Sequence, residues 1–284
     1  MKIFLTGATG YIGSRVLPAL IAAGHSVTAL VRNSSVRGAG VTPVVGDMRD
    51  RDTVRRLASE ADAVIALATP GDATSAAADD DFVGAVLAGL RPGATLLRTG
   101  GIWVYGDGAG ITEEKPLDAP AIVAWREAVD KRALTAPGIR SLLIEPGIVY
   151  GYGTGIPGMF FGDPAEVRLL GPGTQHWATV HVDDLAELYV AALTLGAAGE
   201  RFIAVGGDNP TVREMGEAAS RRLGLDGRVV PEDAAATVAR LGDFGAALLL
   251  DQQASGEKAR RELSWKPTRP SLLDEFRSGA YDPA

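Results

Sequence analysis

Short apolar runs alternate with helical patterns through the first two-thirds of the chain. The runs are bounded by glycine, proline or charged residues, as expected of strands that are buried in a parallel sheet. Predicted strands cover residues 2–6, 26–32, 41–46, 62–68, 94–99 and 140–146. Apolar residues at helical spacing lie between them, for example in residues 75–90 and 121–135. This alternation predicts an α/β fold, a doubly wound parallel (Rossmann) sheet with right-handed crossovers.

The pattern changes after Pro146. Residues 147–164 are rich in glycine and aromatic side chains, which predicts a loop region that lines a cleft rather than a sheet element. A strand and a helix that begins at Asp183 or Asp184 follow, and the chain is mainly helical from residue 211 onward. No linker separates the parts. We therefore predict a dinucleotide-binding domain of residues 1–150 and 178–206, interleaved with a small, mostly helical substrate-side portion of residues 151–177 and 207–284.

Composition narrows the classes of function. The 284 residues carry a formal net charge of −7 without a Lys/Arg run, which argues against a nucleic-acid or anionic-membrane partner. There is no cysteine, and the three histidines are scattered without metal-ligand spacing, so no metal site is expected. No apolar run approaches the roughly 20 residues of a membrane span. The opening residues predict a strand rather than a signal peptide, so we expect a cytoplasmic protein.

Residues 6–13, "TGATGYIG", place Gly7, Gly10 and Gly13 between the first strand and the first helix. Glycines allow a sharp turn and let the backbone approach a diphosphate, whose charge then faces the amides of the helix N-terminus. The strand–loop–helix context is the one that this motif requires. The segment therefore predicts a dinucleotide site.

The spacing TGxxGxxG, together with "GDMRD" at 46–50, "VYG" at 104–106 and "HVDDLA" at 181–186, resembles the extended short-chain dehydrogenase/reductase family. That family includes the nucleotide-sugar epimerases and dehydratases, and the resemblance runs from Thr6 to residues 262–267. It implies that Asp47 and Met48 lie beside the adenine and that residues 66–70 flank the cofactor. It also makes a homodimer through residues 75–90 and 121–135 reasonable. The residues expected to bind cofactor are Gly7, Thr9, Gly10, Tyr11, Ile12, Gly13, Arg32, Asn33, Asp47, Met48, Ala68, Lys131 and Pro146.

The end of the second strand favours NADP over NAD. Enzymes that prefer NAD usually place a carboxylate there to hold the ribose hydroxyls. This chain has "LVRNSS", with Arg32 and Asn33 and no carboxylate. A guanidinium can hold a 2′-phosphate through paired, charge-assisted hydrogen bonds. The alternative is that Arg32 is simply a solvated residue at a strand end.

The catalytic set implied by the resemblance is altered. The family carries a Ser or Thr after the fifth strand and a Tyr-x-x-x-Lys on the next helix. Here residues 100 and 101 are glycine, Thr99 is the nearest hydroxyl, and the second motif becomes Glu127-x-x-x-Lys131. Glutamic acid has a reference pKa of about 4.3 against about 10 for tyrosine, so Glu127 is a poor proton donor. Lys131 either holds the cofactor ribose or forms a surface pair with Glu127, worth about 0.2–0.5 kcal/mol.

Several residues are alternative candidates. Tyr105 and Tyr150 follow predicted strands and can donate a proton from the cleft, although both fit packing roles. His176 is a further candidate from the substrate-side portion, and the alternative is a structural residue or one at the rim. Trp125 and Arg126 are expected to border the substrate, and Arg126 either orients an anion or is merely solvated. Glu145 stands where relatives often carry a basic residue, which disfavours nucleotide sugars, and Asp79–Asp81 are expected to begin a helical turn or remain solvated.

Three functions remain open from the sequence. The first is an atypical NADP-dependent oxidoreductase that acts on a small, non-sugar metabolite and lacks the usual Ser-Tyr-Lys set. The second is a dinucleotide-binding regulator that has lost catalysis. The third is an isomerase or lyase on the same fold that uses Glu127 as a base. In the first case the cofactor carries the hydride chemistry while the protein supplies position and electrostatics.

Overall fold

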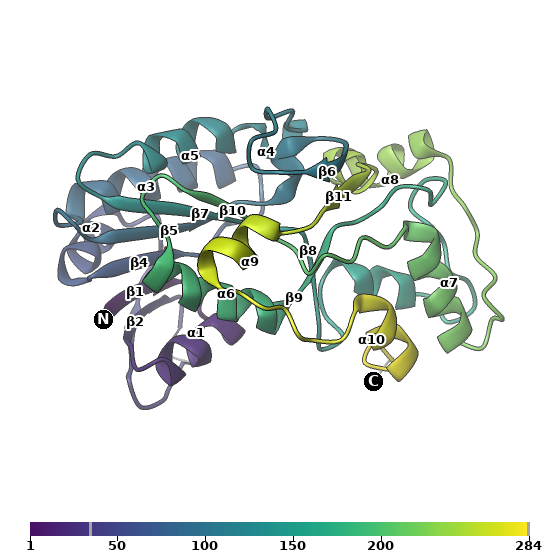
Figure 1. Ribbon diagram of the computed structural model, residues 1–284, viewed down its shortest axis with the longest axis horizontal. Helices are drawn as coiled ribbons and strands as arrows, with labels where there is room; N and C mark the ends of the chain where they lie inside the picture. The colour runs from purple at the N-terminus through teal and green to yellow at the C-terminus, as the bar shows by residue number, and fades with distance from the viewer. Residues whose placement is uncertain (34–35, 283–284) are drawn as a thin grey trace.

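A parallel sheet of seven strands forms the centre of the protein. The computed structural model describes residues 1–33 and 36–282. The strand order is β10-β7-β5-β4-β1-β2-β3, so the chain starts in the middle of the sheet and winds outward in both directions. The doubly wound Rossmann-like fold is confirmed (Figure 1). The strands are β1 (Lys2–Thr6), β2 (Ser26–Val31), β3 (Val41–Val45), β4 (Ala63–Ala66), β5 (Thr95–Thr99), β7 (Arg140–Pro146) and β10 (Arg201–Ala204).

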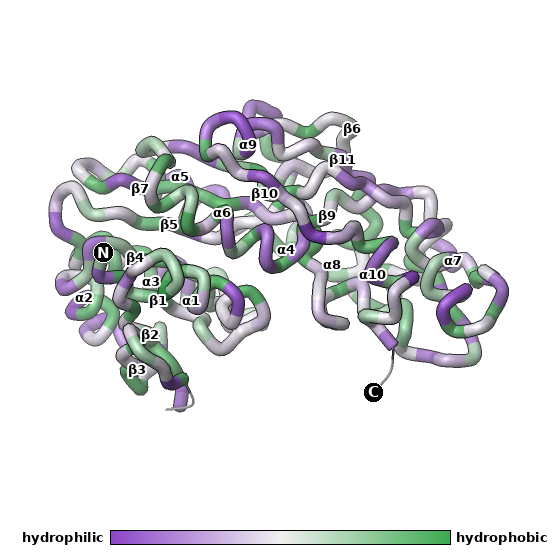
Figure 2. The backbone as a smooth tube through the Cα atoms, turned by 60° about the horizontal axis from the view of Figure 1, so that its bottom comes forward, coloured by the Kyte–Doolittle hydropathy of each residue, from purple (hydrophilic) through white to green (hydrophobic). Residues whose placement is uncertain are grey.

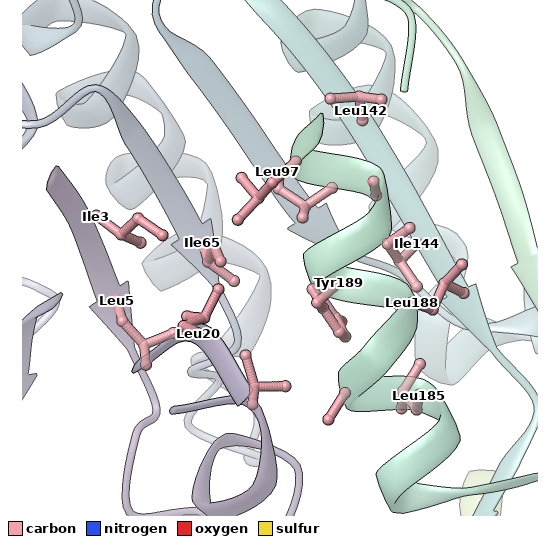
Figure 3. Packing of buried hydrophobic residues seen from close by; sticks show 14 of the residues in the cluster. Ile3, Leu5, Leu20, Ile65, Leu97, Leu142, Ile144, Leu185, Leu188 and Tyr189 are labelled. Atoms are coloured by element: carbon pink, nitrogen blue, oxygen red, sulfur yellow. The ribbon is translucent and has the colours of Figure 1, made fainter. Parts of the chain in front are cut away.

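Helices cover both faces of this sheet. One face packs against α1 (Gly13–Ala22), α6 (Val182–Leu195) and α9 (Glu257–Leu263), and the other against α2 (Arg51–Glu60), α3 (Ser75–Gly89) and α5 (Arg126–Leu134). Successive strand residues point to opposite faces, so Ile3 and Leu5 enter one hydrophobic cluster and Phe4 enters the other. Figure 3 shows the first cluster, in which residues of the strands and of α6 meet: Ile3, Leu5, Ile65, Leu97, Leu185, Leu188 and Tyr189.

A smaller portion built mainly of helices lies beyond the carboxyl ends of the strands. It contains α7 (Val212–Arg222), α8 (Ala234–Leu248), α10 (Leu272–Ser278) and a 3₁₀ helix, η2 (Ile156–Phe161), which enclose a third hydrophobic cluster. Two short parallel pairs join the portions: β8 (Ile148–Tyr150) with β9 (Thr179–His181), and β6 (Gly108–Ile111) with β11 (Gln252–Ala254). Figure 2 shows hydrophobic and hydrophilic residues closely mixed along this portion. The residue bounds of the two domains remain a prediction.

Three local predictions need correction. Residues 147–162 are not all loop, because Ile148 and Tyr150 pack into the third cluster and so form strand β8. Helix α6 begins one or two residues early, since the ring Nδ1 of His181 accepts a hydrogen bond from the Asp183 amide (3.1 Å) and caps the helix. The helix expected over residues 121–135 is interrupted at Trp125, which separates α4 (Ala121–Ala124) from α5.

Within residues 1–33 and 36–282, no helix has both the length and the apolar character needed to cross a membrane. The same described ranges hold no group of three or more His, Asp or Glu side chains placed to bind a metal ion.

Candidate functional site

A cavity of about 560 Å³ lies at the carboxyl ends of β1, β2, β3 and β4. This volume falls in the range of about 300–1,000 Å³ that is typical of small-molecule sites. The position matches the rule for open α/β sheets, in which ligands bind beyond the carboxyl ends of the strands where the winding reverses. The lining residues come from four loops: Thr6, Gly7, Thr9, Gly10, Tyr11, Ile12, Gly13, Leu30, Val31, Arg32, Gly46, Asp47, Met48, Arg49, Leu67, Ala68, Thr69, Pro70 and Asp72.

At Gly7 and Gly13 the glycine loop leaves no space for a side chain. Gly7 has a φ of 74°, and a Cβ there would lie 2.9 Å from the Ala68 amide nitrogen. A Cβ on Gly13 would overlap the carbonyl oxygen of Gly7. Helix α1 begins at Gly13 without a side-chain cap and without an acidic residue in its first turn. The amides of Ser14 and Arg15 already donate to the carbonyl oxygens of Gly10 (2.8 Å) and Ile12 (3.0 Å). The amides of residues 11–13, which line the cavity just before the helix, are therefore the ones that fit the diphosphate of a dinucleotide.

Charged side chains stand at the opposite rim of the cavity. Arg32 is exposed at the end of β2, as predicted from "LVRNSS". An Asp47 carboxylate oxygen accepts a hydrogen bond from the Arg49 amide (2.8 Å), and the Arg49 guanidinium donates to the Thr74 hydroxyl (2.7 Å). Arg49 was not predicted, although "GDMRD" places it two residues after Asp47. Ten of the predicted cofactor residues line the cavity: Gly7, Thr9, Gly10, Tyr11, Ile12, Gly13, Arg32, Asp47, Met48 and Ala68.

The structure does not bring Asn33, Lys131 or Pro146 to the lining of the cavity. Pro146 ends β7, and β5 lies between β7 and β4. Lys131 and Glu127 are both exposed on α5, because Val129, Asp130 and Ala133 form the inward face of that helix.

Thr99 and Arg126 meet at the carboxyl end of β5, the strand next to the cavity wall. The Arg126 guanidinium donates to the Thr99 carbonyl oxygen (3.1 Å) and lies 4.7 Å from the centre of the Trp125 ring. Arg126 is half-buried. Burial lowers its pKa, and the nearby carboxylates of Asp130 and Asp79 oppose that shift. The Thr99 hydroxyl pairs with the hydroxyl of the fully buried Tyr189 on α6 (2.5 Å).

A buried ion network lies behind Arg126. Arg98 of β5 donates to an Asp130 carboxylate oxygen (2.7 and 2.9 Å) and to Asp79 of α3 (2.8 Å), and its side chain is only 2% exposed. The expectation that Asp79–Asp81 are solvated or begin a helix is therefore wrong for Asp79, which lies inside α3 and faces the sheet. Burial raises the pKa of Asp130, while Arg98 and Arg126 oppose the rise. The network holds α3 and α5 to the sheet.

Tyr105 is fully buried and is engaged elsewhere. Its hydroxyl donates to a carboxylate oxygen of Glu145 (2.7 Å), and Arg201 of β10 forms an ion pair with the same carboxylate. Burial raises the pKa of Tyr105, and the Glu145 charge adds to the rise. Tyr105 is therefore a neutral partner of Glu145 in this structure, and it does not line the cavity.

The remaining substrate candidates lie apart from the cavity. The Tyr150 hydroxyl donates to the Pro270 carbonyl oxygen (2.8 Å). The His176 ring nitrogen Nδ1 lies 2.8 Å from an Asp251 carboxylate oxygen, in the substrate-side portion. Trp125 donates its indole N–H to the Ile122 carbonyl oxygen (3.1 Å). Arg126 differs from these candidates in its contact with Thr99, but neither Arg126 nor Thr99 is among the residues that line the cavity.

Comparison with known proteins agrees with the fold. Residues 3–120 match the model of the NAD-dependent epimerase/dehydratase family. An uncharacterised protein of Schizosaccharomyces pombe is 30% identical over 99% of this chain and 100% of its own length. The chain belongs to the NAD-dependent epimerase/dehydratase family. A second relative, a 3-diazoavenalumate denitrifying reductase of a Streptomyces species, is 30% identical over 96% of this chain and 98% of its own.

Solved structures of this epimerase/dehydratase fold extend over the whole chain. Human epimerase family protein SDR39U1, crystallised with NADPH, superposes with a TM-score of 0.78, 21% identity and full coverage of both chains. A dTDP-glucose 4,6-dehydratase of Bacillus anthracis, crystallised with NAD, gives a TM-score of 0.81 and 17% identity over 99% of this chain and 95% of its own. At these identities the likeness extends to the fold alone.

The resemblance to epimerases and dehydratases implies a hydroxyl side chain near residues 100 and 101. The two glycines differ in the space that the structure leaves for a side chain. A Cβ on Gly100 would lie 3.1 Å from the Cγ atom of buried Glu145, whereas the nearest atom to a Cβ on Gly101 is 3.9 Å away. Gly101 has an extended φ of 176°, which any residue adopts. A side chain at position 100 would thus crowd Glu145, whereas one at position 101 would not.

We predict that Gly100→Ser destabilises the protein by about 1–3 kcal/mol, because its side chain would press on the buried side chains of Glu145 and Leu143. Gly101→Ser should stay within about 0.5 kcal/mol of the parent. Urea unfolding of both variants measures the difference. Equal stability of the two variants would contradict this account of Gly100.

Proposed function

We propose that this family member is an NADP-dependent reductase of a small, non-sugar metabolite. The observation that carries the proposal is the cavity at the strand ends, which is lined by the glycine loop leading into α1 and by Arg32. The family and its reductase relative support a nicotinamide dinucleotide as the cofactor. We infer NADP rather than NAD from Arg32 and from the lack of a carboxylate at the end of β2.

The residues present fit such a cofactor. A Cβ on Gly7 or Gly13 would collide with the loop's own backbone or with residues 67 and 68, so these glycines are what lets the loop adopt its shape. The amides of residues 11–13 would hold the diphosphate. Asp47 and Met48 would border the adenine, and Arg32 would hold the 2′-phosphate. A bound nicotinamide would supply the hydride.

Arg126 is the side chain that we propose to act on the substrate. Among the described residues its guanidinium has one hydrogen-bond acceptor, the Thr99 carbonyl, which leaves other N–H groups free to donate. A half-buried guanidinium can stabilise negative charge that develops on a substrate oxygen without giving up its own proton. The proton itself would come from water, since Tyr105 is engaged by Glu145 and Glu127 is exposed.

The non-sugar substrate class is supported by Glu145. Its carboxylate is buried between Tyr105 and Arg201, so this position offers no cation to a diphosphate-linked sugar. The resemblance places a basic residue there in many relatives.

A cytoplasmic location also remains a prediction. A homodimer through α3 and α5 stays a proposal as well, and the exposed residues of these helices are small or charged, such as Ala77, Asp80, Ala128 and Lys131.

The test is a titration with NADPH and with NADH, followed by nicotinamide fluorescence. Arg32→Ala should weaken NADPH binding by about 10- to 100-fold, because a charge-assisted contact to phosphate is worth about 1.5–3 kcal/mol. NADH binding should change less than about threefold, since NADH has no 2′-phosphate. Arg55→Ala, an exposed arginine of α2 outside the cavity, is the matched control. Equal losses for both nucleotides in Arg32→Ala would contradict the NADP assignment.

A Lys131→Ala variant tests whether Lys131 holds the cofactor ribose or only forms a surface pair with Glu127. Because Lys131 is exposed and does not line the cavity, we expect its nucleotide affinity to equal that of the parent. A clear loss would restore the role for Lys131 that the sequence motif suggested.

The regulator without catalysis is the second candidate, and it is favoured by Gly100, Gly101 and the engaged Tyr105. Oxidation of NADPH with a panel of carbonyl, imine and enone compounds would exclude it. Tight binding without turnover on any of them would favour it. The isomerase or lyase is supported less well, because Glu127 lies on the exposed side of α5.

A further inference from the structure

Residues 151–155 form a glycine-rich turn that packs on the side chain of Tyr11 in the glycine loop. The Tyr11 hydroxyl donates to the Gly151 carbonyl oxygen (2.8 Å). A Cβ on Gly155 would lie 3.4 Å from Cε1 of the Tyr11 ring, so the ring and the turn are in close contact. Tyr11 also lines the cavity. The turn therefore supports one wall of the proposed cofactor site.

Tyr281, which follows α10, holds the same turn from the other side. Its hydroxyl accepts a hydrogen bond from the Gly151 amide (3.1 Å) and donates to the Thr154 carbonyl oxygen (2.8 Å). The ring stacks on Phe161 and meets Phe276 of α10 edge to face, with centroid separations of 5.7 and 4.9 Å. Tyr281 is 4% exposed. The turn thus lies between two tyrosine hydroxyls, one from the nucleotide side and one from the substrate side.

Neighbouring contacts fix the position of the turn. A Cβ on Gly151 would lie 2.7 Å from the His181 ring nitrogen Nε2, so the backbone fits closely against His181. That nitrogen in turn lies 3.1 Å from a Glu275 carboxylate oxygen of α10. Tyr152 donates to Asp183 (2.5 Å), which also pairs with Arg15 of α1. The turn has little freedom to move independently of α1, α6 and α10.

We propose that Tyr281 is a positioning residue for dinucleotide binding, acting through the 151–155 turn on Tyr11 and the glycine loop. This inference rests on the proposed function, and it assigns to the C-terminal helix a part in the cofactor site. Tyr281 itself is not among the residues that line the cavity. Its contribution passes through its two hydrogen bonds with the turn and through the hydrogen bond that Tyr11 donates to the turn.

The experiment measures NADPH affinity by fluorescence in a double-mutant cycle of Tyr281→Phe and Tyr11→Phe. Both changes keep the aromatic ring and remove only the hydroxyl. Each single variant should bind NADPH about three- to tenfold more weakly, the loss expected from one hydrogen bond. In the Tyr11→Phe background, Tyr281→Phe should cost no further affinity, because the hydrogen bond between Tyr11 and the 151–155 turn has already been removed. Arg277→Ala, an exposed change on α10 that leaves the turn untouched, is the control and should bind as the parent does.

A merely structural Tyr281 gives a different result. Tyr281→Phe would then lower the unfolding midpoint while the NADPH affinity of the folded protein stayed within twofold of the parent, and this outcome overturns the inference. Losses that multiply in the double variant also overturn it. If Tyr281→Phe fails to fold, hydrogen exchange of the amides of residues 7–13 in Tyr11→Phe replaces it, and unchanged protection counts against the inference. The proposed function fails separately, when the parent protein binds neither nucleotide.

Discussion

Gly13→Ala should abolish nucleotide binding, with affinity for NADPH reduced on the order of 100-fold or more. A Cβ at this position overlaps the Gly7 carbonyl oxygen and would lie 2.9 Å from the Ala8 Cα atom. The loop must therefore move away from α1, which displaces the amides that are proposed to hold the diphosphate. Fluorescence titration with NADPH and urea unfolding of the same samples measure the binding and the stability separately.

Gly10→Ala is the matched control for the fold. A Cβ on Gly10 meets its nearest neighbour, the Gly7 carbonyl oxygen, at 3.3 Å, which small shifts relieve. Its unfolding free energy should stay close to that of the parent. Parent-like NADPH binding by Gly13→Ala would show that the cavity is not a dinucleotide site.

A second large effect, on the free energy of unfolding, is expected from substitution of Arg98. Arg98→Met should lower the free energy of unfolding by about 3–5 kcal/mol, because it removes the hydrogen-bonded cation that two buried carboxylates share. Asp79 and Asp130 are both almost fully buried and both accept hydrogen bonds from Arg98. Arg132→Met, which breaks the exposed pair with Asp80, should cost at most about 1 kcal/mol. Urea unfolding at pH 7 compares the two variants.

The pH dependence of Arg98→Met follows from the same carboxylates. Burial already raises the pKa of Asp130 while Arg98 opposes the rise, so removing Arg98 raises the pKa further. A folded state with a raised pKa binds a proton that the unfolded chain releases, and stability then falls as pH rises through that pKa. The deficit of Arg98→Met should therefore shrink as pH is lowered from 8 toward 5. A deficit that is constant over this range, and that Asp130→Asn does not reduce, would contradict the assignment.

The fold and the glycine loop could be predicted because their signals are local. Apolar runs bounded by glycines mark buried strands, and "TGATGYIG" needs only its own backbone and the next helix to form the loop. The buried network was not predictable in the same way. Arg98, Asp79 and Asp130 come from a strand and two helices, and only the tertiary fold shows that they meet.

The prediction for α5 depended on helical register. Arg126 and Glu127 are one residue apart, and one residue turns a helix by about 100°, which decides whether a side chain faces the sheet or the solvent. The motif drew attention to Glu127 and Lys131, whereas the structure places Arg126 beside Thr99. The interruption at Trp125 was not indicated by the sequence, although Trp125 keeps helical dihedral angles (φ −60°, ψ −22°).

Gly100 and Glu145 are coupled by packing. The Glu145 side chain fills the space that a side chain at position 100 would need, and Arg201 and Tyr105 depend on its carboxylate. Neither position can change freely while the other is kept. A smaller residue at position 145 would make room for a serine at position 100, but it would leave Arg201 without its buried partner. The packing at Gly100 and the ion pair of Arg201 are therefore parts of one arrangement, and a substitution at either position should be studied together with the other.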